Sequence, residues 1–245
     1  LAVPVVALLT VALGFVIEKI AYKPLRSAPR MSVMISAIGV SYLLQNLALY
    51  VTGGLNKTYP TIPWISDPVD LFGATTKRVT LITPVLTIIL VILLVQLINH
   101  TKVGMAMRAV AKDFDTSQLM GIKINNVISV TFIIGSFLAA VGSMLYFSNY
   151  PGVVPTSGAM PGLKAFVAAV FGGIGSIPGA VIGAFIIGVF ESLIKGLDTI
   201  LTTFHIIQSP LELSTFSDAF TFVLLIVILV FKPTGLFGEK ATDKV

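Results

Sequence analysis

Long stretches without charged side chains alternate with short polar segments along the chain. No Asp, Glu, Lys or Arg occurs in 32–56, 79–101, 124–163 or 165–190. A helix needs about 20 mostly apolar residues to cross a hydrocarbon layer roughly 30 Å thick. The pattern predicts an all-α, polytopic integral membrane protein, a multi-helix transmembrane bundle in which 1–245 form one domain. The expected spans lie near 1–20, 32–51, 80–99, 127–148 and 213–231.

One apolar stretch, within the segment 164–196, is interrupted by residues that break helices. The break contains Gly172, Gly173, Gly175, Pro178 and Gly179. About eight residues, roughly 12 Å of helix, separate Lys164 from it, which is too short to span a bilayer. We expect a discontinuous helix pair: a half-helix entering from outside, a turn at membrane depth and a returning helix. Such a turn occurs where protein or a water-filled path covers it, but Gly175, Gly179 and Gly183 also fit a helix-packing face. Both interpretations stay open.

The distribution of basic residues predicts the orientation, because Lys and Arg are retained on the cytoplasmic side. Placing 18–31, 100–126 and the tail 232–245 inside puts eleven of the sixteen basic residues there. The segment 52–78, rich in Gly, Pro and Thr, then becomes an external loop with Trp64 as an interfacial anchor.

The loop 100–126 is polar, basic and long enough for a short surface helix. Its Met107, Val110, Ala111 and Phe114 recur at helical spacing and predict one apolar face, while Arg108 falls elsewhere. Such a face docks into a groove of a partner or rests on lipid headgroups, and the spacing alone does not choose between them.

A few polar residues fall inside the predicted spans. Ser41, Gln45 and Asn46 are candidates for the lining of a solute path, and interhelical hydrogen bonding is the other explanation. Glu191 and Lys195 lie four residues apart, with Asp198 three further on. We interpret them as a structural ion pair near the outer boundary, although a proton relay would use the same residues.

Composition removes several classes of function. Hydrophobic residues make up 56% of the chain and charged ones 11%, unlike a soluble domain. The net charge of +5 is spread over short loops, so no nucleic-acid partner is expected. With no Cys and only two His, the chain offers no catalytic constellation, metal site or cofactor site. It also lacks a phosphate-binding G-x-x-x-x-G-K-[ST] loop, so we expect no enzyme and no ATP hydrolysis on this chain.

Four stretches together resemble the permeases of bacterial branched-chain amino acid ABC transporters, the LivH type. They are TKVGMAMRAVAKDFDTSQLMGIKINNVISVTF from residue 101, YKPLRSAPRMSVMISAIGVSYLLQN from 22, GLKAFVAAVFGGIGSIPGAVIGA from 162 and FKPTGLFG from 231. The chain starts at Leu1 and lacks the family's N-terminal helices with their Asn-Phe-Ala-His-Gly stretch, so we expect it to begin inside a longer product.

The resemblance implies an importer in the bacterial cytoplasmic membrane, with this chain forming part of the path for branched-chain or related small amino acids. It implies two cytosolic ABC ATPase subunits, a second permease subunit that is a related chain or a copy of this one, and an extracytoplasmic substrate-binding protein. An ion-coupled transporter or channel for a small solute such as urea or an amide is the alternative. The implied ATPase-coupling residues are Gly104, Met107, Arg108, Val110, Ala111, Phe114 and Gly121.

Overall fold

The computed structural model shows a helical protein, and among the residues that it describes five helices are long and apolar enough to cross a membrane. It describes residues 2–26, 28–60, 67–71, 74–173, 175–203, 216–232 and 234–238. The chain divides into two compact units, Leu1–Ser157 and Gly158–Val245. Trp64, the side chain of Asp198 and the end of the tail lie outside the described residues.

The first unit contains four of the predicted spans. They are α1 (Ala2–Ile17), α2 (Arg30–Thr52), α4 (Arg78–His100) and α7 (Ile124–Asn149). Pro29 precedes α2 and Gly53 ends it with φ 68°, a left-handed conformation that glycine adopts without strain. Each helix therefore begins and ends near the edge of a charge-free stretch, as the sequence predicted.

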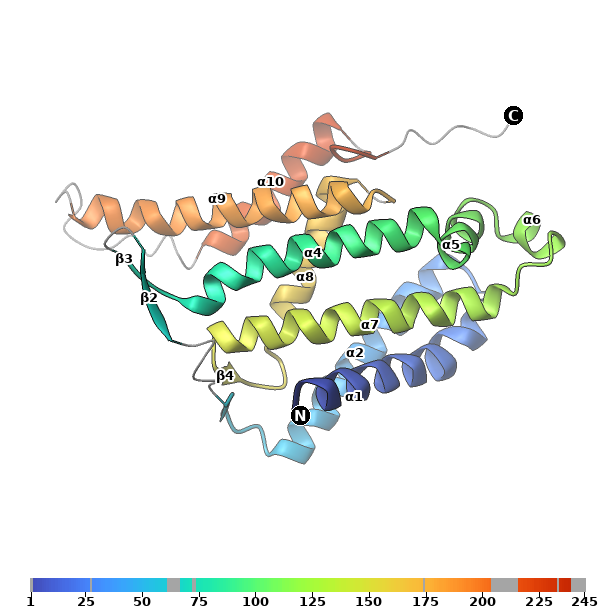
Figure 1. Ribbon diagram of the computed structural model, residues 1–245, viewed down its shortest axis with the longest axis horizontal. Helices are drawn as coiled ribbons and strands as arrows, with labels where there is room; N and C mark the ends of the chain where they lie inside the picture. Colours follow the sequence, from blue (N-terminus) through green and yellow to red (C-terminus); the bar gives the residue numbers. More distant parts are fainter. Residues whose placement is uncertain are drawn as a thin grey trace. The chain divides into compact units, whose positions relative to one another are not determined.

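The first unit is held together mainly by α7. Helix α1 runs beside α7 (Figure 1), and Gly14 permits this approach, because a Cβ there would lie 1.9 Å from the Ser136 hydroxyl oxygen. The rings of Tyr22 and Phe132 continue the contact. Helix α4 also packs on α7, whereas α2 packs against the segment that follows α1. Most apolar side chains of α2 stay exposed, which suits a lipid or a neighbouring helix.

Short strands tie the helix ends together at one side of the first unit. Strand β1 (Lys57–Thr58) pairs antiparallel with β4 (Gly152–Val153), and β2 (Pro68–Leu71) pairs with β3 (Ala74–Lys77). Because β1 follows α2 and β4 follows α7, this pairing holds the C-terminal ends of the two helices on one side, next to Lys57–Thr58 of the predicted external loop.

The second unit contains the predicted broken pair. Helix α8 (Ala159–Gly172) and helix α9 (Ile177–Thr203) pack against each other and against α10 (Ser217–Phe231). Their core is formed by Val167, Ala168, Phe171 and Ile187. Helix α8 begins before Lys164, yet its 14 residues extend only about 21 Å, still short of the hydrocarbon thickness.

Orientation is a testable prediction because the chain has no native cysteine. Lys57 lies in the predicted external loop and Lys112 ends a helix of the predicted cytoplasmic loop; both are exposed. We expect Lys57→Cys to react with a membrane-impermeant maleimide from outside, and Lys112→Cys to react only after the membrane is opened. Labelling of both from the same side would refute the orientation.

Candidate functional site

The predicted cytoplasmic loop begins with a rigid corner between α4 and α5 (Lys102–Lys112). The hydroxyl of Thr101 donates to the Leu97 carbonyl at 2.5 Å and accepts from the Gly104 amide at 3.1 Å, capping α5. A Cβ on Gly104 would lie 2.3 Å from the Ile98 carbonyl oxygen. Arg108 donates to the Asn99 carbonyl at 3.3 Å. These contacts fix the direction in which α5 leaves α4, so Gly104 and Arg108 shape the corner.

A second short helix, α6 (Phe114–Leu119), follows α5 and corrects the predicted single apolar face. Asp113 has an extended conformation that ends α5, and its carboxylate accepts from the Thr116 amide at 3.1 Å to cap α6. The Ser117 hydroxyl donates to the Asp113 carbonyl at 2.6 Å. Phe114 therefore belongs to another helix than Met107, Val110 and Ala111.

The most exposed apolar side chains of this loop lie at the end of α6, although Val103 and Met105 of α5 are exposed as well. Leu119 is 87% exposed and Met120 79%, and Phe114 is also exposed, whereas Met107 and Val110 are half-buried. Gly121 turns the chain with φ 81° directly after them. The sequence prediction omitted Leu119 and Met120, because they follow the proposed helical face. Asp113 is a capping residue type, and Phe114, Ser117 and Gln118 follow it at helical spacing. Together they were the signal in the sequence for a second helix that begins after Asp113.

The backbone between α8 and α9 leaves the helical conformation at the predicted glycines. Gly173 (φ 109°) and Gly175 (φ 99°) adopt conformations that other residues rarely reach. The Ser176 hydroxyl accepts from the Gly179 amide at 3.2 Å, and Pro178 lies in the first turn of α9, where its missing N–H costs no helical bond.

The break is also a site of close backbone packing. A Cβ on Gly172 would lie 2.1 Å from the Gly179 carbonyl oxygen, and one on Gly183 would lie 2.6 Å from the Ala168 carbonyl oxygen. The predicted packing face is therefore correct for Gly179 and Gly183. It is wrong for Gly175, which precedes α9 and whose Cβ, if one were added, would have no neighbour within 4 Å among the described residues.

The first part of the predicted tail covers the end of α8. The amides of Leu236 and Phe237 donate to the carbonyls of Phe171 and Gly172, both at 2.9 Å. Because α8 ends at Gly172, these two carbonyls have no hydrogen-bond donor within the helix. Gly235 fits in the left-handed conformation (φ 77°), with its built Cβ only 2.6 Å from the Gly173 Cα. The 234–238 segment thus completes the break, a role that the sequence analysis did not assign.

An ion network connects the three helices of the second unit. Glu191 binds Lys195 at 2.6 Å and Lys164 at 3.0 Å, and Lys164 also binds Asp218 at 2.7 Å. The structural pair Glu191–Lys195 is therefore present, within a larger group. Sequence spacing missed Lys164 and Asp218, because they come from α8 and α10.

The polar residues of α2 bond within their own helix. The Gln45 amide donates to the Ser41 hydroxyl at 3.2 Å, and the Asn46 amide donates to the Tyr42 carbonyl at 2.8 Å. Ser41 and Asn46 are exposed within this chain. These bonds leave open both a path-lining role and a contact with another helix, so the role of all three residues stays a prediction.

A buried acidic residue lies where α1 ends. Glu18 is 1% exposed, and one carboxylate oxygen binds the Arg26 guanidinium while the other accepts from the Ser129 hydroxyl at 2.9 Å. Arg26 also donates to the Asn125 side chain. The pair joins the end of α1 to the start of α7. The sequence prediction included Arg26 only as one of the basic residues of the segment 18–31, and it did not single out Glu18.

The comparisons with known proteins decide which family has this architecture. Residues 1–229 match the family model described as the permease component of branched-chain amino acid transport systems. The chain belongs to this permease family. The predicted family, helical membrane fold and non-catalytic transmembrane role are thereby confirmed, and the permease is a multi-pass protein of the cytoplasmic membrane.

Individual relatives agree with the family match. The permease is 37% identical to the high-affinity branched-chain amino acid transport system permease protein LivH of Salmonella typhimurium, over 96% of this chain and 72% of that protein. It is 36% identical to the corresponding protein BraD of Pseudomonas aeruginosa, over 97% and 74%. It is also 28% identical to the ribose import permease protein RbsC of Haemophilus influenzae, over 81% and 61%. No solved structure matches the permease significantly.

Proposed function

We propose that this permease forms part of the translocation path for branched-chain or related small amino acids. Support comes from the similarity to two high-affinity branched-chain amino acid permeases over nearly the whole chain, at higher identity than to the ribose permease. The broken pair α8–α9 and the polar residues Ser41, Gln45 and Asn46 are the candidates for the path, because backbone turns at membrane depth accompany substrate paths in transporters.

We further propose that two cytosolic ATPase subunits bind the α5–α6 region, that a second permease subunit completes the path and that an extracytoplasmic protein delivers the solute. The observation that supports ATPase docking is the rigid corner at Thr101 and Gly104, followed by exposed Phe114, Leu119 and Met120. A corner fixed to a membrane-spanning helix transmits a displacement, and an exposed apolar surface supplies the contact. An ion-coupled carrier would require neither feature.

The test is reconstitution of the transporter from this permease with candidate ATPase, binding and second permease proteins of the same organism. We expect the permease to purify together with ATPase subunits. In proteoliposomes, ATP and the binding protein should drive leucine uptake, with competition by isoleucine and valine and none by ribose. Uptake of leucine that follows an ion gradient and needs no ATPase would contradict the ABC mechanism. Competition by ribose alone would contradict the cargo and leave the mechanism standing.

A further inference from the structure

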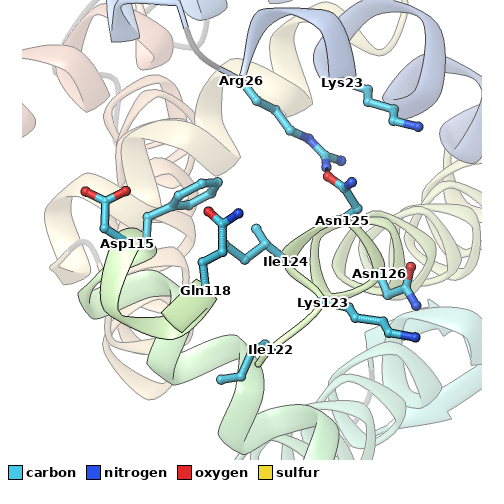
Figure 2. A pocket seen from close by; sticks show the side chains of 10 residues that line it. Lys23, Arg26, Asp115, Gln118, Ile122, Lys123, Ile124, Asn125 and Asn126 are labelled. Carbon is cyan, nitrogen blue, oxygen red and sulfur yellow. Dashed lines mark hydrogen bonds between the residues drawn. The ribbon is translucent and has the colours of Figure 1, made fainter. Parts of the chain in front are cut away.

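Two adjoining cavities lie in the first unit, where α1, α6 and α7 meet. The larger, about 800 Å³, is bounded by α6, the start of α7 and the segment after α1 (Figure 2). The smaller, about 420 Å³, continues between α1 and α7. Both are lined by Lys23, Arg26, Asn125 and Asn126, so they form one cleft.

The cleft carries more positive than negative charge. Lys19, Lys23, Arg26 and Lys123 line it, against the carboxylates of Glu18 and Asp115. Glu18 is fully engaged by Arg26 and Ser129. In the part of the chain that the structure describes, neither Lys23 nor Lys123 forms an ion pair. In the view of Figure 2 these two lysines extend to one side and Asp115 lies on the other.

The backbone at the rim is unusual. Glu18–Tyr22 form a π-helix, η1, which passes directly into a 3-10 turn, η2 (Lys23–Leu25). Single π turns inside helices are rare and concentrate at functional sites. This turn supplies Glu18 and Lys19 to the cleft. The Arg26 side chain keeps its Nε buried without a hydrogen-bond partner among the described residues.

Part of the cleft wall is apolar. Phe15 of α1 and Val130 and Ile133 of α7 line the smaller cavity beside its charged and polar residues. Ile20, next to Lys19 in η1, is 72% exposed, and much of the apolar surface of α1 is exposed as well. A ligand that fits both ends has an anionic head and an apolar tail. A soluble phosphate would use only the basic end.

We propose that this cleft binds the phosphate-bearing headgroup of an anionic phospholipid, with its acyl chains along α1. Lys23 and Lys123 neutralise the headgroup, and the side-chain amides of Asn125, Asn126 and Gln118 donate to its oxygens. Basic pockets between helices on the cytoplasmic side are suited to such headgroups, and the predicted orientation places this cleft on that side. Because α6 forms one wall, the bound lipid would contact the element proposed to meet the ATPase.

The test uses the full chain within its purified transporter, stripped of lipid and examined by native mass spectrometry. Phosphatidylglycerol and phosphatidylcholine with identical acyl chains are the two probes. The cleft variant is Lys23→Gln with Lys123→Gln. The matched control is Lys102→Gln with Lys112→Gln, which removes the same charge from exposed lysines of α5 that line neither cavity.

We expect the unaltered chain and the control to bind phosphatidylglycerol more tightly than phosphatidylcholine. The cleft variant should bind phosphatidylglycerol on the order of tenfold more weakly and lose the preference. Equal binding by cleft variant and control would overturn the proposal. Displacement of the lipid by glycerol 3-phosphate at equal concentration would assign the cleft to a soluble phosphate instead. Unchanged lipid binding with loss of the ATPase subunits would assign it to that protein.

Discussion

Replacing Gly173 with alanine is expected to lower the stability of the permease strongly and to reduce uptake to background. The backbone there has φ 109°, and a built Cβ lies 2.3 Å from the Gly238 amide nitrogen. The strained conformation costs about 1–3 kcal/mol, and forcing apart packed backbone costs a similar amount, about 1–3 kcal/mol. Because Gly238 cannot retreat as a flexible side chain would, both costs apply.

Two other glycines separate strain from crowding. Gly175 has φ 99°, and an added Cβ would have no neighbour within 4 Å among the described residues, so Gly175→Ala should incur strain alone, about 1–3 kcal/mol. Gly188 lies inside α9, where an added Cβ would meet no other described residue within 4 Å, and Gly188→Ala should stabilise the helix by about 0.5–1 kcal/mol. Thermal unfolding in detergent should rank the variants in this order. Equal stability of Gly173→Ala and Gly188→Ala would contradict the close approach of the 234–238 segment.

The helices and their break could be predicted because the signals are local. A charge-free run such as 79–101 has the length that a bilayer requires, and it became α4 with little change at either end. The glycines and Pro178 likewise stop a helix by their own backbone preferences. The predicted break therefore fell at the observed residues.

The contacts across the fold could not be predicted in this way. Ser129 binds Glu18 from a position 111 residues away, and Lys164 reaches Asp218 from another helix. Hydrophobic periodicity places a residue on one face of its own helix, but it does not predict which other helix that face contacts. An acidic residue such as Glu18, next to a 17-residue run without charge, was the available signal for a buried pair.

The loop 100–126 contains one feature that the sequence predicted correctly and one that it did not. Its helical character followed from the spacing of Met107 and Val110, and α5 confirms it. The extension of that face to Phe114 was wrong, because Asp113 prefers to cap a new helix rather than continue the old one. Periodicity counted the apolar residues and gave no weight to the capping residue between them.

Changing Leu119 to aspartate is expected to release the ATPase subunits while the membrane helices stay folded. The side chain is 87% exposed within this chain, so the substitution removes little internal packing. In a docked groove the new carboxylate would lose its water, at a cost on the order of 3 kcal/mol unless it finds a partner. That corresponds to roughly a hundredfold weaker association. Val110 is a poorer position for this test, because it is half-buried and a charge there would disturb folding as well as docking.

The matched control is Leu55→Asp, because Leu55 is 71% exposed in the predicted external loop. It introduces the same charge at a similar exposure on what is predicted to be the opposite side of the membrane. We expect the control to purify with normal amounts of ATPase and to retain hydrolysis stimulated by the binding protein and its solute. The Leu119 variant should lose both and elute as a monodisperse membrane protein. Normal ATPase content and stimulation in the Leu119 variant would exclude the end of α6 from the contact with the ATPase, because a carboxylate buried in that contact would weaken ATPase binding.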